Sequence, residues 1–159
     1  MKRVFLIRHG EAEFTGHGRG DHGRVLTSEG VEQAAHLGGI LAEMGIEVIL
    51  ASSADRAAQT ATGMGLSAPV ELHEDLYNAS TFGILRVLAE VPPEVETVAV
   101  VAHAPGVPAL VHDLSGPGSD PDASAQVKHH FPTATVAGIG FAGTWDDLAG
   151  SRLLWASRG

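Results

Sequence analysis

The chain alternates between short, continuous apolar runs and segments in which apolar residues recur at helical spacing. Residues 4–7, 47–51 and 97–102 are rich in β-branched side chains and have almost no polar interruption. Runs of this kind predict strands that are buried on both faces. Two further strands are expected at 134–141 and 152–156, and residues 69–72 predict a short strand or a loop.

Four segments between these runs predict helices. Apolar residues from Val31 to Met44 follow a helical period, Thr27 or Ser28 offers an N-cap, and Gly45 provides a stop. The others are expected from a cap at Ser53 to about 64, over 81–90, and from 105 to about 114. Residues 10–26 and 115–130 are rich in Gly and polar groups and predict two long loops, here called the first and second excursions. Long loops in a compact domain usually have a functional role.

Strands that alternate with helices predict an α/β fold with helices on both faces of a largely parallel sheet. The last two strands follow each other without a helix, which indicates an antiparallel edge. We therefore expect a three-layer α/β/α sandwich formed by one domain over residues 1–159. In such open sheets, ligands bind at the carboxyl ends of the strands.

Three of the predicted strand ends carry basic or imidazole side chains. Arg8 and His9 follow the first strand, Arg56 lies just beyond the second, and His103 follows the most apolar strand. Together they form a cationic set without a carboxylate, which is costly unless an anion occupies it. A phosphoryl group can accept hydrogen bonds from all of them, and imidazole is a nucleophile near neutral pH.

Composition narrows the possible partners. The chain has 159 residues, a net charge of −9 and no cysteine. The charge disfavours nucleic acid and anionic membranes as partners, while the missing thiols exclude disulfides and a cysteine nucleophile. No apolar run is long enough for a signal peptide or a membrane span, so a cytoplasmic location is expected. Eight of the ten basic residues are arginine, which suits recognition of oxyanions.

The two excursions contain residue patterns that resemble known dinucleotide-binding or metal-binding motifs. Residues 18–23 match G-x-G-x-x-G, but they neither follow a strand directly nor open a helix, so a dinucleotide site is rejected. His17, Asp21 and His22 form one possible metal-ligand set, and His129-His130 with Asp120 or Asp122 form another. Both lack a metal-binding framework and are interpreted as solvated loop residues. No metal and no cofactor are expected.

Five segments together resemble the histidine phosphatase superfamily, which includes the cofactor-dependent phosphoglycerate mutases. They are RHGEA (8–12), LTSEGVEQA (26–34), SSADRAAQTA (52–61), LYNAS (76–80) and VAHAP (101–105), in the order found in that family. The chain is most similar to the small SixA-like phosphohistidine phosphatases. The resemblance implies a phosphoglycerate mutase-like fold and a metal-independent phosphatase.

The resemblance also implies roles for individual residues. His9 would be the nucleophile that becomes phosphorylated, with Arg8, Arg56 and His103 as its catalytic, phosphate-binding partners. Arg24 either reaches the phosphate or is a solvated loop residue. Arg19 is a weaker candidate, and Thr15 and Ser52 are candidate donors at the rim only.

Two positions depart from the family pattern. Ala104 replaces the usual Asn after the second histidine, and Asn78 stands where larger relatives carry an acidic proton donor. Glu74, Asp75 or no residue at all would then supply the acid. Because an alkoxide leaving group needs a proton more than an imidazole does, the pattern favours a phosphohistidine protein or a small activated phosphate as substrate. A phosphate-monoester phosphatase or mutase-like enzyme, and a non-catalytic phosphate-binding module, remain the alternatives.

Overall fold

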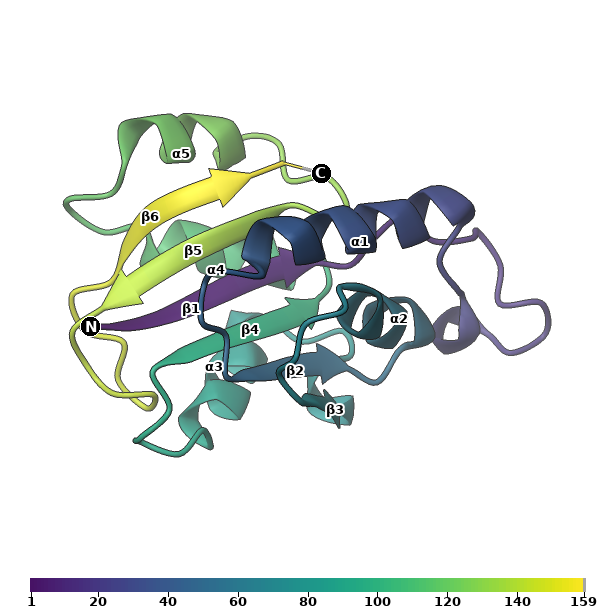
Figure 1. Cartoon of the computed structure of the whole chain (residues 1–159), viewed down its shortest axis with the longest axis horizontal. Helices are drawn as coiled ribbons and strands as arrows, with labels where there is room; N and C mark the ends of the chain where they lie inside the picture. The colour runs from purple at the N-terminus through teal and green to yellow at the C-terminus, as the bar shows by residue number, and fades with distance from the viewer. Residues whose placement is uncertain (159) are drawn as a thin grey trace.

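The computed structural model describes residues 1–158, which form one six-stranded sheet flanked by helices (Figure 1). The sheet order is β3-β2-β4-β1-β5-β6. β1 runs parallel to β4, β4 to β2 and β2 to β3, whereas β5 is antiparallel to both β1 and β6. The strands are β1 (Lys2–Arg8), β2 (Val48–Ser52), β3 (Val70–His73), β4 (Thr97–Ala102), β5 (Val136–Phe141) and β6 (Arg152–Ser157). The predicted mixed sheet with an antiparallel edge is confirmed.

Helices cover both faces of the sheet, as the alternation predicts. The helices are α1 (Ser28–Leu41), α2 (Asp55–Gly63), α3 (Thr81–Ala89), α4 (Gly106–Leu114) and α5 (Pro121–Val127), with short 3₁₀ turns η1 (Asp21–Gly23) and η2 (Glu74–Leu76). In Figure 1, α1 and α2 lie in front of the sheet and α3 and α4 lie behind it. Within residues 1–158, no helix has the length and apolarity to cross a membrane.

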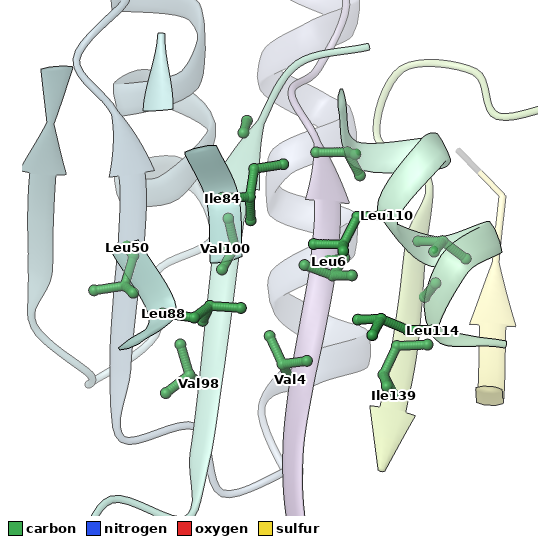
Figure 2. Close-up of a cluster of buried hydrophobic side chains, with 14 of the residues drawn as sticks. Val4, Leu6, Leu50, Ile84, Leu88, Val98, Val100, Leu110, Leu114 and Ile139 are labelled. Atoms are coloured by element: carbon green, nitrogen blue, oxygen red, sulfur yellow. The ribbon is translucent and has the colours of Figure 1, made fainter. Parts of the chain in front are cut away.

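The continuous apolar runs exist because each central strand is buried on both faces. In β1, Val4 and Leu6 belong to the core shared with α3 and α4, whereas Phe5 and Ile7 belong to the core under α1 and α2. Figure 2 shows the first of these cores, with strand side chains meeting those of the two helices. Alternate side chains point to opposite faces of a strand, so only a run without polar residues satisfies both layers.

Two predicted helix boundaries were wrong. The first helix ends at Leu41 rather than Met44, because the chain turns before Gly45, whose φ of 73° is accessible to glycine at little cost. α2 is capped at Ala54 rather than Ser53. The hydroxyl of Ser53 hydrogen-bonds to His22 instead, at 3.0 Å.

The second excursion was also predicted wrongly, because it contains a helix. α5 begins with Pro121 at its first turn, and the Asp120 carboxylate caps it by accepting from the Ala123 amide at 2.9 Å. Ala123 is buried in the core that includes residues of β6. Proline and aspartate start a helix here, although in a Gly-rich stretch they indicate a loop equally well.

Candidate active site

The ends of β1 and β4 bring two histidines together. Arg8 pairs in register with Ala102, and the His9 amide donates to the Ala102 carbonyl at 3.0 Å. His9 and His103 therefore stand on neighbouring strand ends, with ring centroids 5.2 Å apart. Both are buried, and Arg56 of α2 is buried as well. The sheet topology thus gathers the four residues that the sequence placed at strand ends.

The environment of His9 selects one tautomer. Its Nδ1 lies 2.7 Å from the carbonyl oxygen of Gly10, so a neutral ring donates from Nδ1 and keeps its lone pair on Nε2. Gly10 is itself fixed, since its amide donates to the Thr60 hydroxyl at 3.0 Å. A Cβ at position 10 would lie 2.9 Å from the backbone oxygen of Gly30, so this close approach requires glycine.

Burial keeps both imidazoles neutral. Desolvation lowers the pKa of His9 to about 4, and Arg56 and Arg8 add to the effect while the bond to Gly10 opposes it. Desolvation likewise lowers the pKa of His103 to about 3, with further contributions from His9 and Arg56. A neutral imidazole with a free Nε2 is a competent nucleophile at pH 7.

A carboxylate also enters the site, which corrects the prediction of a set without one. The backbone and side chain of Asp21 accept from Arg56 at 2.8 and 3.1 Å, and Arg24 Nη1 donates to the same carboxylate at 3.0 Å. The Tyr77 hydroxyl donates to it at 2.5 Å. These bonds, that of Tyr77 first, hold the pKa of Asp21 far below its usual range. Asp21 is therefore a fixed anion and not a proton donor.

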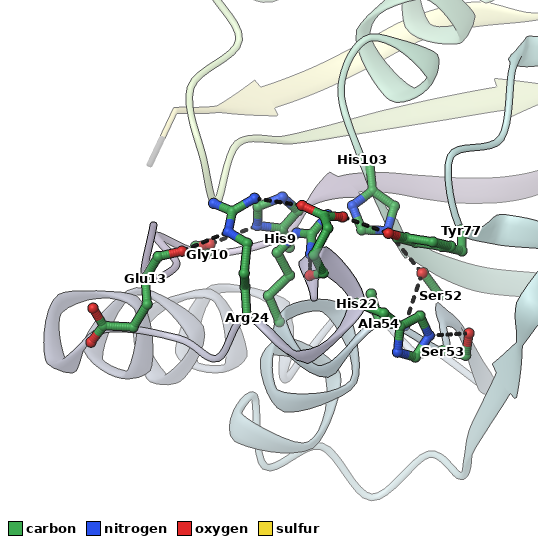
Figure 3. Close-up of polar contacts among 12 residues, drawn as sticks. His9, Gly10, Glu13, His22, Arg24, Ser52, Ser53, Ala54, Tyr77 and His103 are labelled. Carbon is green, nitrogen blue, oxygen red and sulfur yellow. Dashed lines mark hydrogen bonds and ion pairs between the residues drawn. The ribbon is translucent and has the colours of Figure 1, made fainter. Parts of the chain in front are cut away.

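Arg24 joins the site through this carboxylate. Its Nε donates to the Glu13 carbonyl at 2.6 Å, which ties together the two arms of the first excursion (Figure 3). Its positive charge contributes to the lowered pKa of His9. Arg24 therefore lies within electrostatic reach of the His9 ring.

Three buried nitrogens at the site have no hydrogen-bond partner within the described part of the chain. They are Nε of Arg8, Nε of Arg56 and Nδ1 of His103. Arg8 uses one terminal nitrogen, which donates to the Phe131 carbonyl at 3.0 Å. Buried polar groups are rarely left unpaired, and cationic donors gathered in this way fit an oxyanion.

The three remaining candidates are bonded to other residues of the chain. Ser52 is not a rim donor: it is fully buried, and its hydroxyl lies 2.8 Å from His103 Nε2. Arg19 is exposed and pairs with Asp55, and the exposed Thr15 hydroxyl accepts from the His17 amide.

The two carboxylates considered as general acids lie in η2, directly before Tyr77 in the chain. Glu74 and Asp75 are exposed in η2, and among residues 1–158 neither carboxylate forms a hydrogen bond or an ion pair. Asn78 instead lines a cleft of about 430 Å³ with Ser80, His103 and Pro105, and no carboxylate of the described chain lines that cleft. Among the described residues, no group of three or more His, Asp or Glu is arranged to hold a metal ion.

Sequence reasoning missed Asp21, Tyr77 and Thr60 as parts of the site. Tyr77 and Thr60 lie within two of the segments that carry the family resemblance, whereas the signal for Asp21 is its spacing from Arg24, since residues three apart in a turn can pair. Tyr77 packs edge-on against both His22 and His103 at centroid distances of 4.9 and 5.7 Å. Nothing in one sequence indicates that residues 56 positions apart would share a hydrogen bond.

Comparison with known sequences identifies a family. Residues 4–90 match the family model described as the histidine phosphatase superfamily, branch 1. The chain is 36% identical over 130 residues to the uncharacterized protein ML1117 of Mycobacterium leprae, which covers 80% of this chain and 81% of that protein.

Solved structures agree with this family. A protein assigned as the phosphohistidine phosphatase SixA of Nakamurella multipartitia superposes with a TM-score of 0.88 at 32% identity, covering 99% of this chain and 95% of that one. The protein histidine phosphatase SixA in complex with tungstate superposes with a TM-score of 0.78 at 26% identity, covering 98% and 96%.

Proposed function

The chain belongs to the histidine phosphatase superfamily and is a phosphatase, and from this premise we propose that it hydrolyses phosphohistidine through a covalent intermediate on His9. The substrate is a phosphohistidine protein, or a small phosphorylated molecule whose leaving group is as good as the imidazole of phosphohistidine. The observation that carries the proposal is the neutral His9 ring, which donates from Nδ1 to Gly10 and leaves Nε2 free among cationic donors. We further propose a cytoplasmic location, which agrees with a chain without cysteine.

In the first step, Nε2 of His9 attacks phosphorus. The P–N bond to the substrate imidazole breaks, and that imidazole keeps the electron pair and takes a proton from water. Arg8 and Arg56 hold the phosphoryl oxygens, and Arg24 adds positive charge nearby. The Gly10 carbonyl accepts from Nδ1–H throughout, which stabilises the positive charge of the phosphorylated ring.

In the second step, a water oxygen attacks the phosphorus of phosphorylated His9 and loses a proton. The P–Nε2 bond breaks, which releases inorganic phosphate and restores neutral His9. His103 lies against His9 and contributes its imidazole to the phosphoryl site. No step requires a carboxylic acid.

The cleft lined by Asn78 and His103 has no acidic residue among its described lining, and this favours phosphohistidine over a phosphate monoester as the substrate. An alkoxide leaving from a monoester needs a proton from a positioned group. The cleft presents Asn78 and Ser80 rather than a carboxyl group. The SixA protein of Nakamurella multipartitia, which is assigned as a phosphohistidine phosphatase, supports this choice.

Covalent labelling tests the proposal. Incubation with radiolabelled phosphoramidate and an alkaline quench should leave acid-labile phosphate on wild-type protein and none on His9→Ala. His9→Ala should lose turnover but retain part of its affinity for a phosphate analogue, because the arginines stay in place.

The matched control is His36→Ala, which removes an exposed histidine of α1. This variant should carry as much labelled phosphate as wild type. Wild-type protein that neither labels nor hydrolyses phosphohistidine would instead support the non-catalytic phosphate-binding module.

A further inference from the structure

A groove of about 570 Å³ adjoins the active site and takes no part in the chemistry described above. One wall begins at Ala104 and Pro105, immediately after His103, and continues along α4. The opposite wall is the end of α5 and the segment after it, up to Phe131. The Phe131 carbonyl is the acceptor that holds Arg8 at 3.0 Å, so both walls connect directly to the phosphoryl site.

The groove combines an apolar floor with basic and imidazole side chains. Pro108, Val111 and Val127 line it together with Phe131, of which Val111 and Phe131 are buried. A volume of this size lies within the range of ligand sites, and it exceeds what a phosphoryl group fills.

The polar lining is entirely neutral or basic. Lys128, His112, His129 and His130 are exposed in the groove, and no Asp or Glu of residues 1–158 lines it. None of these four side chains makes a hydrogen bond or an ion pair with another residue of the described chain. The groove therefore has a local excess of basic side chains in a protein whose net charge is −9.

We propose that this groove binds an acidic peptide segment of the protein substrate, next to its phosphohistidine. Carboxylates of that segment pair with Lys128 and the neighbouring histidines, while an apolar side chain packs on the half-buried Pro108 and Val127. Long polyanions are disfavoured, because the global negative charge repels them beyond the groove. The inference rests on the proposed function, since it identifies which part of a phosphohistidine substrate meets the enzyme outside the reacting group.

The test compares two short phosphohistidine peptides of equal length with phosphoramidate as a small donor. One peptide carries Leu and several Glu beside the phosphohistidine, and the other carries Lys in place of each Glu. Wild-type kcat/KM should favour the acidic peptide by about tenfold. In Lys128→Glu this preference should fall about fivefold or more, while phosphoramidate turnover stays within about twofold of wild type.

Arg86→Glu is the matched control, because it makes the same charge change on an exposed α3 residue outside the groove. It should leave the preference intact. Equal turnover of both peptides by wild type, or an unchanged preference in Lys128→Glu, would overturn the proposal.

Binding of the unphosphorylated acidic peptide, measured by fluorescence anisotropy, separates this proposal from the phosphatase activity. Weaker binding to Lys128→Glu than to wild type supports the groove even if phosphoramidate is not hydrolysed. Equal binding to the two proteins refutes the groove while leaving the activity of His9 untouched.

Discussion

Asp21 places a negative charge against the arginines that we assign to phosphate. Its carboxylate accepts from Arg56, Arg24 and Tyr77, and half of its side chain remains exposed. Arg56 gives one terminal nitrogen to this carboxylate and one to the Asp21 carbonyl, while its buried Nε has no partner in the described chain, so an anion bound there would lie beside the carboxylate. Asp21 therefore neutralises the cationic cluster when no phosphate is bound, and it opposes anions that enter.

Asp21→Asn should consequently bind inorganic phosphate more tightly. Removing a fixed negative charge beside the anion site relieves repulsion and frees donors, and a gain of several-fold corresponds to about 1 kcal/mol. The measurement is the inhibition constant for inorganic phosphate, or the dissociation constant by calorimetry. Asp55→Asn provides the control, since Asp55 precedes Arg56 but pairs with the exposed Arg19. Weaker phosphate binding in Asp21→Asn would show that the carboxylate serves to position the arginines instead.

The residues at strand ends could be predicted from one sequence, whereas their supports could not. The residue after a buried strand must lie at the edge of the sheet, so topology alone placed Arg8, His9 and His103. Asp21 and Tyr77 reach the same edge from an excursion and a 3₁₀ turn. Their positions depend on tertiary packing, which leaves no periodic pattern in the sequence.

Among the elements, α1 and α2 meet at a backbone contact that constrains one glycine. A Cβ at Gly38 would lie 1.8 Å from the Met64 carbonyl oxygen, whereas a Cβ at the adjacent Gly39 would meet nothing within 4 Å. The close approach brings α2, which carries Arg56, against α1. Packing at this contact therefore helps to set where Arg56 stands.

Gly38→Ala and Gly39→Ala should shift stability in opposite directions. Gly38→Ala forces the helices apart and should lower the free energy of unfolding by about 2 kcal/mol or more. Gly39→Ala should raise it by about 0.5–1 kcal/mol, because alanine loses less conformational entropy than glycine in a helix. Urea denaturation of both variants measures this. A Gly38→Ala protein as stable as wild type would contradict the close contact.

A helix or strand could be predicted from the sequence where one hydrophobic pattern, either a continuous apolar run or a helical period, covered the whole element. Buried strands and the helices between them follow from apolar runs and helical periods, and their order gave the layered sheet. α5 was missed because its seven residues span about two turns and offer too few apolar positions to show a period. The cap at Ala54 was missed because Ser53 has a competing partner in His22.

At the scale of the whole molecule, the site makes stability depend on pH. His9 and His103 are held neutral by burial, with pKa values of about 4 and about 3 instead of 6.5. Between pH 6.5 and 4 the unfolded chain therefore binds protons that the folded chain does not. Stability is greatest above the unfolded pKa and falls as the pH decreases through this window.

The free energy of unfolding should accordingly decrease by about 3 kcal/mol from His9 alone as the pH falls from 6.5 towards 4. Denaturation midpoints at several pH values should show a steep slope for wild type and a shallower one for His9→Asn. His36→Asn, which alters an exposed histidine, should keep the wild-type slope. Equal slopes for wild type and His9→Asn would contradict this prediction, because they would show that the pKa of His9 is the same in the folded and unfolded protein.

Inorganic phosphate should reduce the slope of wild-type stability against pH, because a bound anion favours the protonated imidazoles that burial otherwise suppresses.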